Sequence, residues 1–350
     1  MTAAYINRIG TAVPPFDVHR KFSEVAMASL PGTKARQAFR RMAHRAQIDH
    51  RYSFLAPESC FEIGGFYQRG QYPDTSARMR FFEQHAPTLA AIALENMNVS
   101  SCKDCITHLI VACCTGFYAP GLDVDIVNRF GLSSTVERTT VGFMGCHAGI
   151  SALKLARHIV RSEPAAKVVV VNLELCTIHL QDTEELEQML CFVFWGDGCS
   201  ASLVSAEPTG IELQSFHSTL IGESSDQLTW RVGRHGFDIV LSGRIAQTLA
   251  RELPDKIEVV LGGRRVRDIV LWALHPGGRA VLDAIGKTID LQEAALGCSR
   301  EVLWRFGNMS SATIAFVLKA MLERKSSGLG CAMAFGPGLT AESMVFEAAG

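Results

Sequence analysis

The sequence predicts an α/β protein made of two related halves. Runs of β-branched apolar residues, typical of strands buried on both faces, alternate along the chain with segments of helical hydrophobic spacing. One arrangement also occurs twice. Gly145-Cys146 opens an apolar helical segment, and Gly307-Asn308 opens another 162 residues later (308 − 146). The same offset places the apolar run 168–173 on the run 330–335, so we expect two pseudo-symmetric halves.

Length and composition indicate a globular protein with reduced thiols. The 350 residues are 48% hydrophobic, enough for a large core in one large domain or two smaller ones. A net charge of −1 gives no overall attraction to nucleic acid or to an anionic membrane. No apolar run approaches the roughly 18 residues of a membrane span, and no secretory signal is recognised. Eleven cysteines without regular spacing indicate a cytoplasmic protein rather than a disulfide framework.

The first half is expected to begin with an irregular region, 1–75, rich in Arg, Phe and Gly. Helical spacing starts at Ser76 and continues through Leu94. The further elements expected here are a strand at 106–112, a helix from Cys146 to Val160, a strand at 167–173, and a hairpin at 192–204 interrupted by Trp195-Gly-Asp-Gly198.

The second half repeats the alternation of helices and strands. Its expected strands are 269–274 and 330–335, and its expected helices are 244–252, 279–285 and 310–323. No low-complexity linker separates the halves, and the join falls near Glu207-Pro-Thr-Gly210. We therefore divide the chain into residues 1–207 and 208–350.

Cys146 is the candidate nucleophile. A cysteine at a helix start lies in the positive field of unpaired backbone N–H groups, which favours the reactive thiolate. Gly145 before it permits the strained turn that exposes the sulfur. The alternative is an inert buried cysteine, which is how we interpret the other ten.

His275 and Asn308 are its candidate partners from the second half. His275 follows the strand 269–274, at the carboxyl end of the strand, where α/β proteins place their sites. It stands 33 residues before Asn308, and Cys113 likewise stands 33 residues before Cys146. A structural histidine and a plain helix N-cap are the alternatives. Three chemically capable residues at equivalent junctions of two halves favour a shared site.

Two further patterns are less specific. Cys102-Lys-Asp-Cys105 is a single CxxC motif without a second pair, so we do not predict a metal site there. A basic stretch holds five cations within twelve residues: Lys34, Arg36, Arg40, Arg41 and Arg45. Arg41 and Arg45 stand one helical turn apart, so the stretch is either a solvated face or a phosphate clamp.

Five motifs along nearly the whole chain resemble those of the type III polyketide synthases, the chalcone-synthase-like branch of the thiolase superfamily. The motifs are Gly142-Phe-Met-Gly-Cys146, Trp195-Gly-Asp-Gly198, His275-Pro-Gly-Gly-Arg-Ala-Val-Leu282, Gly307-Asn-Met-Ser-Ser-Ala312 and Phe335-Gly-Pro-Gly-Leu339. The combination of His-Pro-Gly-Gly with Phe-Gly-Pro-Gly distinguishes it from ketoacyl synthase III. The resemblance implies a five-layered αβαβα fold and a homodimer.

The resemblance also implies roles for the candidate residues. Cys146 would carry an acyl starter as a thioester, while His275 and Asn308 would bind the thioester oxygen of malonyl-CoA as CO2 leaves. Fixed donors at a developing negative charge stabilise the transition state more than the ground state. Coenzyme A thioesters are then the substrates, with no metal or redox cofactor. The positions that match the family's coenzyme A contacts are Arg41, Arg45, Gly277, Gly278 and Ala280, whereas Ala38 replaces a lysine usual in plants.

Residues matched to the family's product cavity depart from the plant pattern. Trp195 stands where plant enzymes carry a gatekeeping Phe, while Phe237 matches the second gatekeeper. His179 and Cys114 occupy positions usually held by Thr. The pattern resembles bacterial members, which often convert fatty acyl-CoA starters into alkylpyrones or alkylresorcinols.

The sequence thus predicts a decarboxylative polyketide synthase that uses acyl-CoA and malonyl-CoA. Starter length, the number of extensions and the mode of ring closure depend on cavity shape and are left open. One rival is a ketoacyl synthase III-like enzyme, which would need an acyl carrier protein. The other is a non-catalytic paralogue that binds acyl-CoA, although a binding module has no need of the Cys, His and Asn set.

Overall fold

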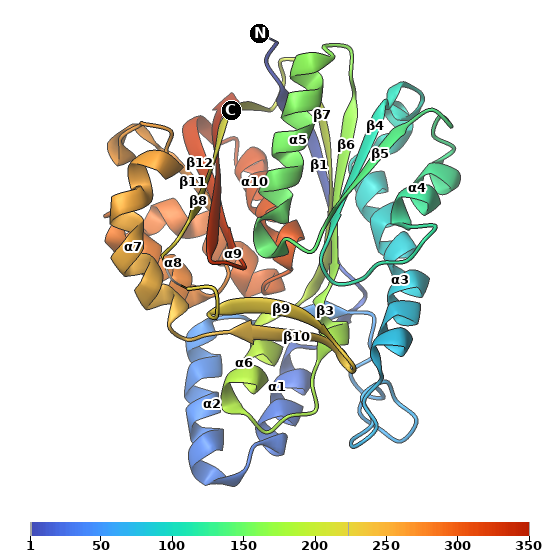
Figure 1. Cartoon of the computed structure of the whole chain (residues 1–350), viewed down its shortest axis with the longest axis vertical. Helices are drawn as coiled ribbons and strands as arrows, with labels where there is room; N and C mark the ends of the chain where they lie inside the picture. Colours follow the sequence, from blue (N-terminus) through green and yellow to red (C-terminus); the bar gives the residue numbers. More distant parts are fainter. Residues whose placement is uncertain (1, 223, 350) are drawn as a thin grey trace.

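The computed structural model describes residues 2–222 and 224–349, and its centre is one mixed sheet (Figure 1). The strand order is β11-β12-β13-β8-β1-β7-β6-β4-β5. Their bounds are β1 Tyr5–Ala12, β4 His108–Cys113, β5 Glu137–Gly142, β6 Val168–Leu175, β7 Asp197–Ser205, β8 Ile211–Leu220, β11 Leu271–Leu274, β12 Ser327–Gly336 and β13 Thr340–Ala349. β1 and β8 pair only at Tyr5 with Glu212 and Ile6 with Ile211, so the sheet divides there into one part from each half.

Helices complete a five-layered αβαβα arrangement around the two parts of the sheet (Figure 1). The central layer is α5 (Ala148–Ser162) and α10 (Thr313–Glu323), which share one apolar core with strands of both parts. One outer layer holds α3 (Thr75–Asn96) and α4 (Leu122–Phe130), packed on β4, β6 and β7. The other consists of α7 (Ile245–Val260), α8 (Arg279–Thr288) and α9 (Gly297–Phe306).

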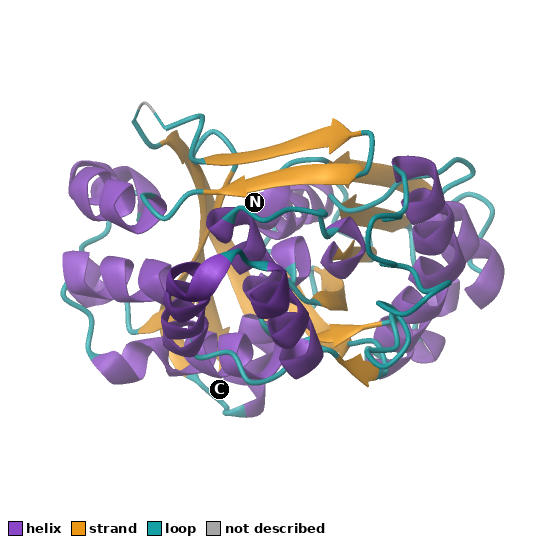
Figure 2. Cartoon of the chain, turned by 90° about the horizontal axis from the view of Figure 1, so that it is seen from below, coloured by secondary structure: helices purple, strands orange, loops and turns teal. Residues whose placement is uncertain are grey.

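A group of additional elements covers one end of the layers, the lower end in Figure 1. They are β2 (Phe16–Asp17), α1 (His19–Ser29), α2 (Gly32–Ala46), β3 (Tyr52–Ser53), α6 (Leu186–Phe194), β9 (Leu228–Gly233) and β10 (Gly236–Leu241). Figure 2 looks onto this end, with the antiparallel ribbon of β9 and β10 along one side. The functional candidates lie between this end and the layered core.

The predicted strands at 106–112, 167–173, 269–274 and 330–335 are confirmed as β4, β6, β11 and β12. The repeated junction is confirmed as well. Gly145 and Gly307 both have left-handed φ values, +77° and +67°. Gly145 opens the short turn that leads into α5, and Gly307 precedes the short turn that leads into α10. The two helix starts meet, because a Cβ on Gly149 of α5 would lie 2.4 Å from the backbone oxygen of Ser311.

Two predictions about local structure are wrong. Residues 1–75 are not irregular, since they contain the central strand β1 and the helices α1 and α2. β1 is interrupted by Asn7 and Arg8, so it lacks an apolar run, and its strand state comes from pairing with β7. The run 192–204 is not a hairpin: its first residues end α6 and its remainder is β7. An apolar run has the same appearance in a buried helix and a buried strand, so tertiary packing decides.

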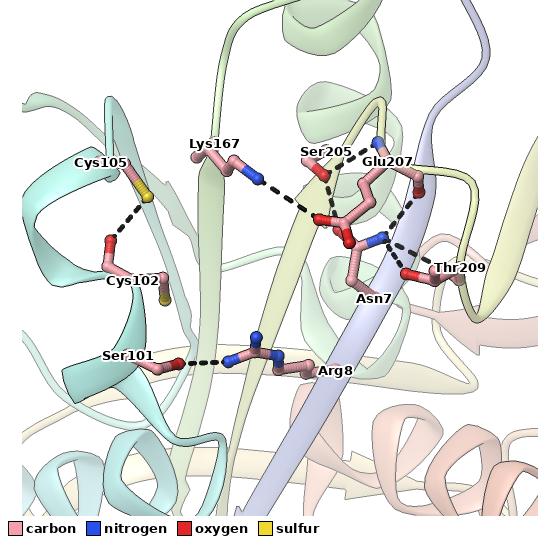
Figure 3. A network of polar contacts seen from close by, with 9 residues as sticks. All are labelled: Asn7, Arg8, Ser101, Cys102, Cys105, Lys167, Ser205, Glu207 and Thr209. Atoms are coloured by element: carbon pink, nitrogen blue, oxygen red, sulfur yellow. Dashed lines mark hydrogen bonds and ion pairs between the residues drawn. The ribbon is translucent and has the colours of Figure 1, made fainter.

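The chain passes from one half to the other between β7 and β8, through a turn held by Asn7 (Figure 3). The Asn7 amide Nδ2 donates to the backbone oxygens of Glu207 and Thr209 at 2.8 and 3.1 Å. Its Oδ1 accepts from the hydroxyl of Ser205 at 2.7 Å. The side chain from β1 therefore fixes the join, and the division at 207/208 stays a prediction about domain organisation.

Candidate active site

Cys146 lies between β5 and α5, in a single 3-10 turn that spans Gly145–His147 (η3). Gly145 is required there on two grounds: its φ is left-handed, and a Cβ would lie 2.4 Å from a ring carbon of Pro337. Cys146 is 5% exposed, and its Sγ lies 4.0 Å from Oδ1 of Asn308. The turn thus points the thiol toward the second half of the protein.

His275 directly follows β11, and its backbone N–H donates to the oxygen of Met333 at 2.8 Å. The residue is 2% exposed, and neither ring nitrogen has a hydrogen-bond partner within the part of the chain that the structure describes. Buried polar groups are normally hydrogen-bonded, so an unpartnered imidazole is free to bind a substrate atom.

Asn308 is held at both its backbone and its side chain. Its N–H donates to the oxygen of Phe194 at 2.7 Å, and its own oxygen accepts from Gly196 N–H at 2.9 Å. Its Oδ1 accepts from Ser310 N–H at 2.9 Å, while Nδ2 donates weakly to the oxygen of Gly277 at 3.4 Å. The strong bonds orient the amide, and the long one leaves Nδ2 available as a donor.

The structure brings Cys146, His275 and Asn308 together, as the sequence repeat predicted. All three line one cavity of about 30 Å³, whose other walls include Trp195 and Phe335. The volume suits little more than a water molecule, so a reacting group placed there would contact all three side chains.

Burial keeps the candidate acid and base neutral when each is taken alone. It raises the pKa of Cys146 to about 12 and lowers the pKa of His275 to about 3, because a buried charge loses its hydration. Proton transfer from Cys146 to His275 would create two opposite charges in the same cavity, and their attraction offsets part of that loss. Electrostatically, therefore, the thiolate depends on the imidazole.

Glu174 is a polar residue of this region that the sequence analysis missed. It is the penultimate residue of the apolar strand β6 and is fully buried. Its carboxylate accepts from Cys114 N–H at 3.0 Å, from the Thr115 hydroxyl at 2.8 Å and from the Ser311 hydroxyl at 2.5 Å. Burial raises its pKa despite these bonds. Glu174 thus joins the two halves behind Cys146, and a lone acid in a strand of valines was the signal that could have found it.

Trp195 lies in the wall of the cavity that Cys146, His275 and Asn308 line. It is 3% exposed, and its ring meets Trp230 edge to face at a centroid distance of 5.5 Å. Phe237 is fully buried and belongs to the same apolar cluster as Cys146 and Trp195. Both gatekeeper candidates therefore lie beside the nucleophile candidate.

His179 lies next to this wall but makes structural contacts. Its Nε2 donates to the oxygen of Thr115 at 2.6 Å, and its Nδ1 accepts from the N–H of Phe237 at 3.0 Å. Its ring also stacks on Phe237 at 4.2 Å. Both nitrogens are occupied, so His179 positions Phe237. His179 and Trp195 also line a second cavity of about 30 Å³.

Cys114 is 2% exposed, and its sulfur accepts from the N–H of Gly145 at 3.1 Å. Burial raises the pKa of the Cys114 thiol well above its ordinary value, so it stays a neutral thiol. It supports the turn that carries Cys146.

A pocket of about 600 Å³ adjoins the catalytic cavity. Four of the predicted coenzyme A contacts line it, namely Arg45, Gly277, Gly278 and Ala280. Arg41 is exposed one turn away on α2 and is not part of the lining. The pocket shares Leu241, Ile245, Gly277 and Val281 with the cavity beside Cys146, so the two spaces adjoin at these residues.

The CxxC motif has no metal-binding arrangement around it. The Cys105 thiol donates to the backbone oxygen of Cys102 at 2.9 Å (Figure 3). Within residues 2–222 and 224–349, no group of His, Cys, Asp and Glu side chains is arranged to hold a metal ion. Nor is any helix in these ranges long and apolar enough to cross a membrane.

Comparisons with known proteins identify the family. The model of chalcone and stilbene synthases matches residues 2–208 with its N-terminal domain and residues 212–349 with its C-terminal domain. The chain is 31% identical to the alpha-pyrone synthesis polyketide synthase-like Pks18 of Mycobacterium tuberculosis, covering 99% of this chain and 91% of the relative. It is 30% identical to the bisdemethoxycurcumin synthase of Oryza sativa, covering 99% and 92%.

Solved structures agree with the fold. The C-terminal type III polyketide synthase domain of Steely1 from Dictyostelium superposes with a TM-score of 0.90 at 21% identity, covering 99% of both chains. A type III pentaketide synthase from Neurospora crassa gives 0.87 at 22% identity, again covering 99% of both. With its thiolase-type layers and its match to both family domains, this chain belongs to the chalcone and stilbene synthases, the type III polyketide synthases, and is an acyltransferase that uses coenzyme A thioesters.

Proposed function

We propose that this enzyme condenses malonyl-CoA with an acyl starter bound to Cys146 and then cyclises the product in the same site. The observation that carries the proposal is the meeting of Cys146, His275 and Asn308, from both halves, at the inner end of the pocket. The nucleophile comes from the first half and the hydrogen-bond donors come from the second.

Loading begins when His275 takes the proton of Cys146. The thiolate attacks the carbonyl carbon of the acyl-CoA, and the coenzyme A thiol leaves with that proton. His275 then returns to the neutral form that burial favours, with a ring N–H free to donate.

Extension follows with malonyl-CoA. The bond to its carboxylate breaks, CO2 leaves, and the electron pair forms an enolate whose oxygen accepts from His275 and from Nδ2 of Asn308. The enolate carbon attacks the Cys146 thioester and releases the thiolate. The electrons come from the broken carbon–carbon bond, so the proposed reaction requires no redox cofactor or metal.

A fatty acyl starter fits the surroundings best. The walls of the pocket are mostly apolar and include Met42, Leu186, Leu190 and Phe194. The relative from Mycobacterium tuberculosis is described as an alpha-pyrone synthesis enzyme, so we propose an alkylpyrone or alkylresorcinol product. Trp195 would limit the space for the growing chain. A cytoplasmic location and a bacterial source remain predictions.

We further propose a homodimer formed through β5. This strand is the edge of the sheet, and its residues are mostly exposed. Exposed Phe117, Phe143 and Met144 lie on either side of it in the chain, and paired edges remove such unpaired backbone and apolar surface. Light scattering should give twice the mass of the 38.1 kDa chain, and a monomeric mass would disprove the dimer.

Cys146→Ala tests the division of roles. Incubated with a panel of acyl-CoAs and malonyl-CoA, this variant should lose starter loading and polyketide formation while keeping part of the malonyl-CoA decarboxylation, because His275 and Asn308 remain. Intact-mass spectrometry and product analysis check both readouts. Asn308→Ala is the matched control, expected to load starter but to lose decarboxylation. A starter adduct on the Cys146→Ala protein with unchanged product would disprove the assignment.

A further inference from the structure

Two buried indole N–H groups near Cys146 have no hydrogen-bond acceptor. Trp195 is 3% exposed and Trp230 is 9% exposed, and both belong to the apolar cluster that contains Cys146. Nε1 of each ring has no partner among the residues that the structure describes. An indole N–H can only donate, and buried donors are normally paired. Two unpaired donors beside the nucleophile therefore indicate an acceptor that arrives with the substrate.

The Cys191 thiol lies beside the Trp195 indole but does not replace such an acceptor. Burial raises the pKa of this thiol to about 12, so it stays neutral, and the sulfur of a neutral thiol accepts hydrogen bonds only weakly. The thiol itself donates to the backbone oxygen of Glu187 at 3.6 Å. The N–H of Trp195 thus remains available to an oxygen of a ligand.

Trp195 is the wall that two small cavities share. One is the cavity lined by Cys146, His275 and Asn308, and the other is the second cavity of about 30 Å³. The ring of Trp230 packs against this wall edge to face, at a centroid distance of 5.5 Å. Both indole groups therefore stand at the boundary between the two cavities.

The ribbon of β9 and β10 borders both cavities and carries Trp230 (Figure 2). Leu228 pairs with Leu241, and both line the cavity of Cys146. Trp230 pairs with Ile239, which lines the second cavity. Side chains two residues apart on a strand point to the same face, so Leu228 and Trp230 lie next to each other on the buried face. A chain that extends from Cys146 along this ribbon meets Trp230 after Leu228.

The apolar pocket of about 600 Å³ adjoins both small cavities. It shares Leu241 with the cavity of Cys146 and Cys191 with the second cavity. Each small cavity, at about 30 Å³, has room for a carbonyl oxygen but not for an alkyl chain. An alkyl tail therefore has room in the large pocket, whereas the small cavities suit single polar groups.

The proposed reaction produces acceptors of the required kind. Each condensation turns the previous thioester carbonyl into a ketone, so ketone oxygens occur at every second carbon of the extended part. A saturated fatty acyl starter has no oxygen except that of its thioester, which lies at Cys146. The indole donors therefore have no partner on the starter and gain partners once extension begins.

We propose that the indole N–H groups of Trp195 and Trp230 bind ketone oxygens of the extended chain and so determine how many extensions precede release. The inference rests on the proposed function, because only malonyl extension creates these ketones. Hydrogen bonds to the chain slow its release, since they must break before the chain can leave or fold into another ring. Trp195 then does more than limit space, and Trp230 is a second binding residue that no sequence motif indicated.

The test removes each N–H without changing the shape of the ring. In 3-benzothienylalanine a sulfur atom replaces the indole N–H, so its site-specific incorporation at Trp195 or at Trp230 removes only the donor. With octanoyl-CoA and malonyl-CoA, the ratio of products from later extensions to products released one extension earlier should fall by at least about threefold, the effect of one hydrogen bond of ordinary net strength. Product profiling by mass spectrometry measures this ratio.

Starter loading on Cys146 and malonyl-CoA decarboxylation are measured in the same samples. Slower decarboxylation would also shorten the products, so the inference requires a loss in the product ratio larger than any loss in that rate. Trp272 gives the matched control, because it is buried on β11 and lines neither small cavity. The same replacement at Trp272 should leave loading, decarboxylation and the product ratio unchanged.

An unchanged product ratio in both replacements would show that the two tryptophans only fill space and would overturn the inference. An equal shift at Trp272 would overturn it as well. If the Trp195 replacement does not fold, the Trp230 replacement decides alone. Wild-type protein that neither loads octanoyl-CoA nor decarboxylates malonyl-CoA would disprove the proposed function itself, whereas normal loading with an unchanged ratio in the replacements would retain the function and reject only the inference.

Discussion

At the scale of single residues, a charge on Cys146 and an opposite charge on His275 each offset part of the free energy lost when the other is buried. Taken alone, each stays neutral, since burial raises the pKa of the thiol to about 12 and lowers the pKa of the imidazole to about 3. A thiolate at neutral pH then requires the imidazolium beside it as a partner. Asn308 contributes no charge, so its role in loading should be smaller.

Because His275 can carry a charge and Asn308 cannot, replacing His275 should lower the reactivity of the Cys146 thiol more than replacing Asn308. In His275→Gln, alkylation of Cys146 by iodoacetamide at pH 7 should slow by at least about tenfold, because the thiol loses the base that accepts its proton and with it the opposite charge that stabilises the thiolate. Asn308→Ala is the control and should change the rate little. Peptide mass spectrometry separates Cys146 from exposed Cys105. Equal rates in wild type and His275→Gln would show that the helix start alone activates the thiol.

At the scale of elements, the segment that carries Trp195 pairs with the segment that carries Asn308, and Arg51 contacts both segments. Trp195 and Asn308 form a parallel bridge, and Nη1 of Arg51 donates to the oxygen of Trp195 at 2.7 Å. The Arg51 stem packs against Gly307, where a Cβ would lie 2.8 Å from Cγ of the arginine. Arg51 is fully buried and does not touch the catalytic cavity, so it is a positioning residue.

Removing the guanidinium should therefore disturb catalysis through Asn308. We expect Arg51→Met to lower kcat for malonyl-CoA decarboxylation by about tenfold or more with little change in KM, and to cost about 1 to 3 kcal/mol of stability for the oxygen left without its donor. Arg51→Lys should partly restore kcat. Steady-state kinetics and urea unfolding measure both effects.

The control is Arg78→Met. Arg78 is equally buried, but it bonds to the backbone oxygens of Pro73 and Ile178, away from Asn308. It should lose comparable stability with a smaller loss of kcat. Parallel losses of kcat and stability in the two variants would mean that Arg51 only supports the fold.

At the scale of the whole molecule, buried ionisable groups set the response to acid. Burial lowers the pKa values of His19, His179 and His275 to about 3 from an ordinary 6.5. Between pH 3 and pH 6.5 these three histidines bind protons in the unfolded chain but not in the folded chain. Their contribution to stability is thus complete above pH 6.5 and is lost as the pH falls toward 3. Asp197 acts in the opposite direction, since burial raises its pKa to about 7, so acidification favours the folded state there.

We therefore expect the free energy of unfolding to fall between pH 7.5 and pH 5. His275→Gln should remove about 2 kcal/mol of that fall, because one buried imidazole contributes about 1.4 kcal/mol per pH unit below 6.5. His275 makes no side-chain hydrogen bond within the described residues, so the change in pH slope is little obscured by lost contacts. Asp197→Asn should shift the slope the other way and steepen the loss. Urea unfolding at both pH values measures the slopes, and an unchanged slope in His275→Gln would contradict the buried neutral ring.

The sequence alone determined the features that depend on near neighbours in the chain. The apolar runs that became β4, β6, β11 and β12 were predicted as buried strands because each run is apolar on both faces and is shorter than a typical helix. Glycines at 145 and 307 marked turns of left-handed φ before Cys146 and Asn308, and the repeat predicted that these junctions are equivalent. The family and the three candidate catalytic residues followed from these motifs.

Only the tertiary structure decided how distant segments act on one another. Glu174 lies in an apolar strand, and its hydrogen-bond partners Cys114 and Ser311 are 60 and 137 residues away in the chain. His179 matched a cavity position in sequence, yet its ring nitrogens bond to the backbone of Thr115 and Phe237. Chain-local energies cannot specify such contacts, because hydrogen bonds and burial between distant segments form only when the two parts of the sheet pack around α5 and α10. The same packing makes β1 a strand, places Arg45 in the wall of the large pocket and forms the cavity that Cys146, His275 and Asn308 line.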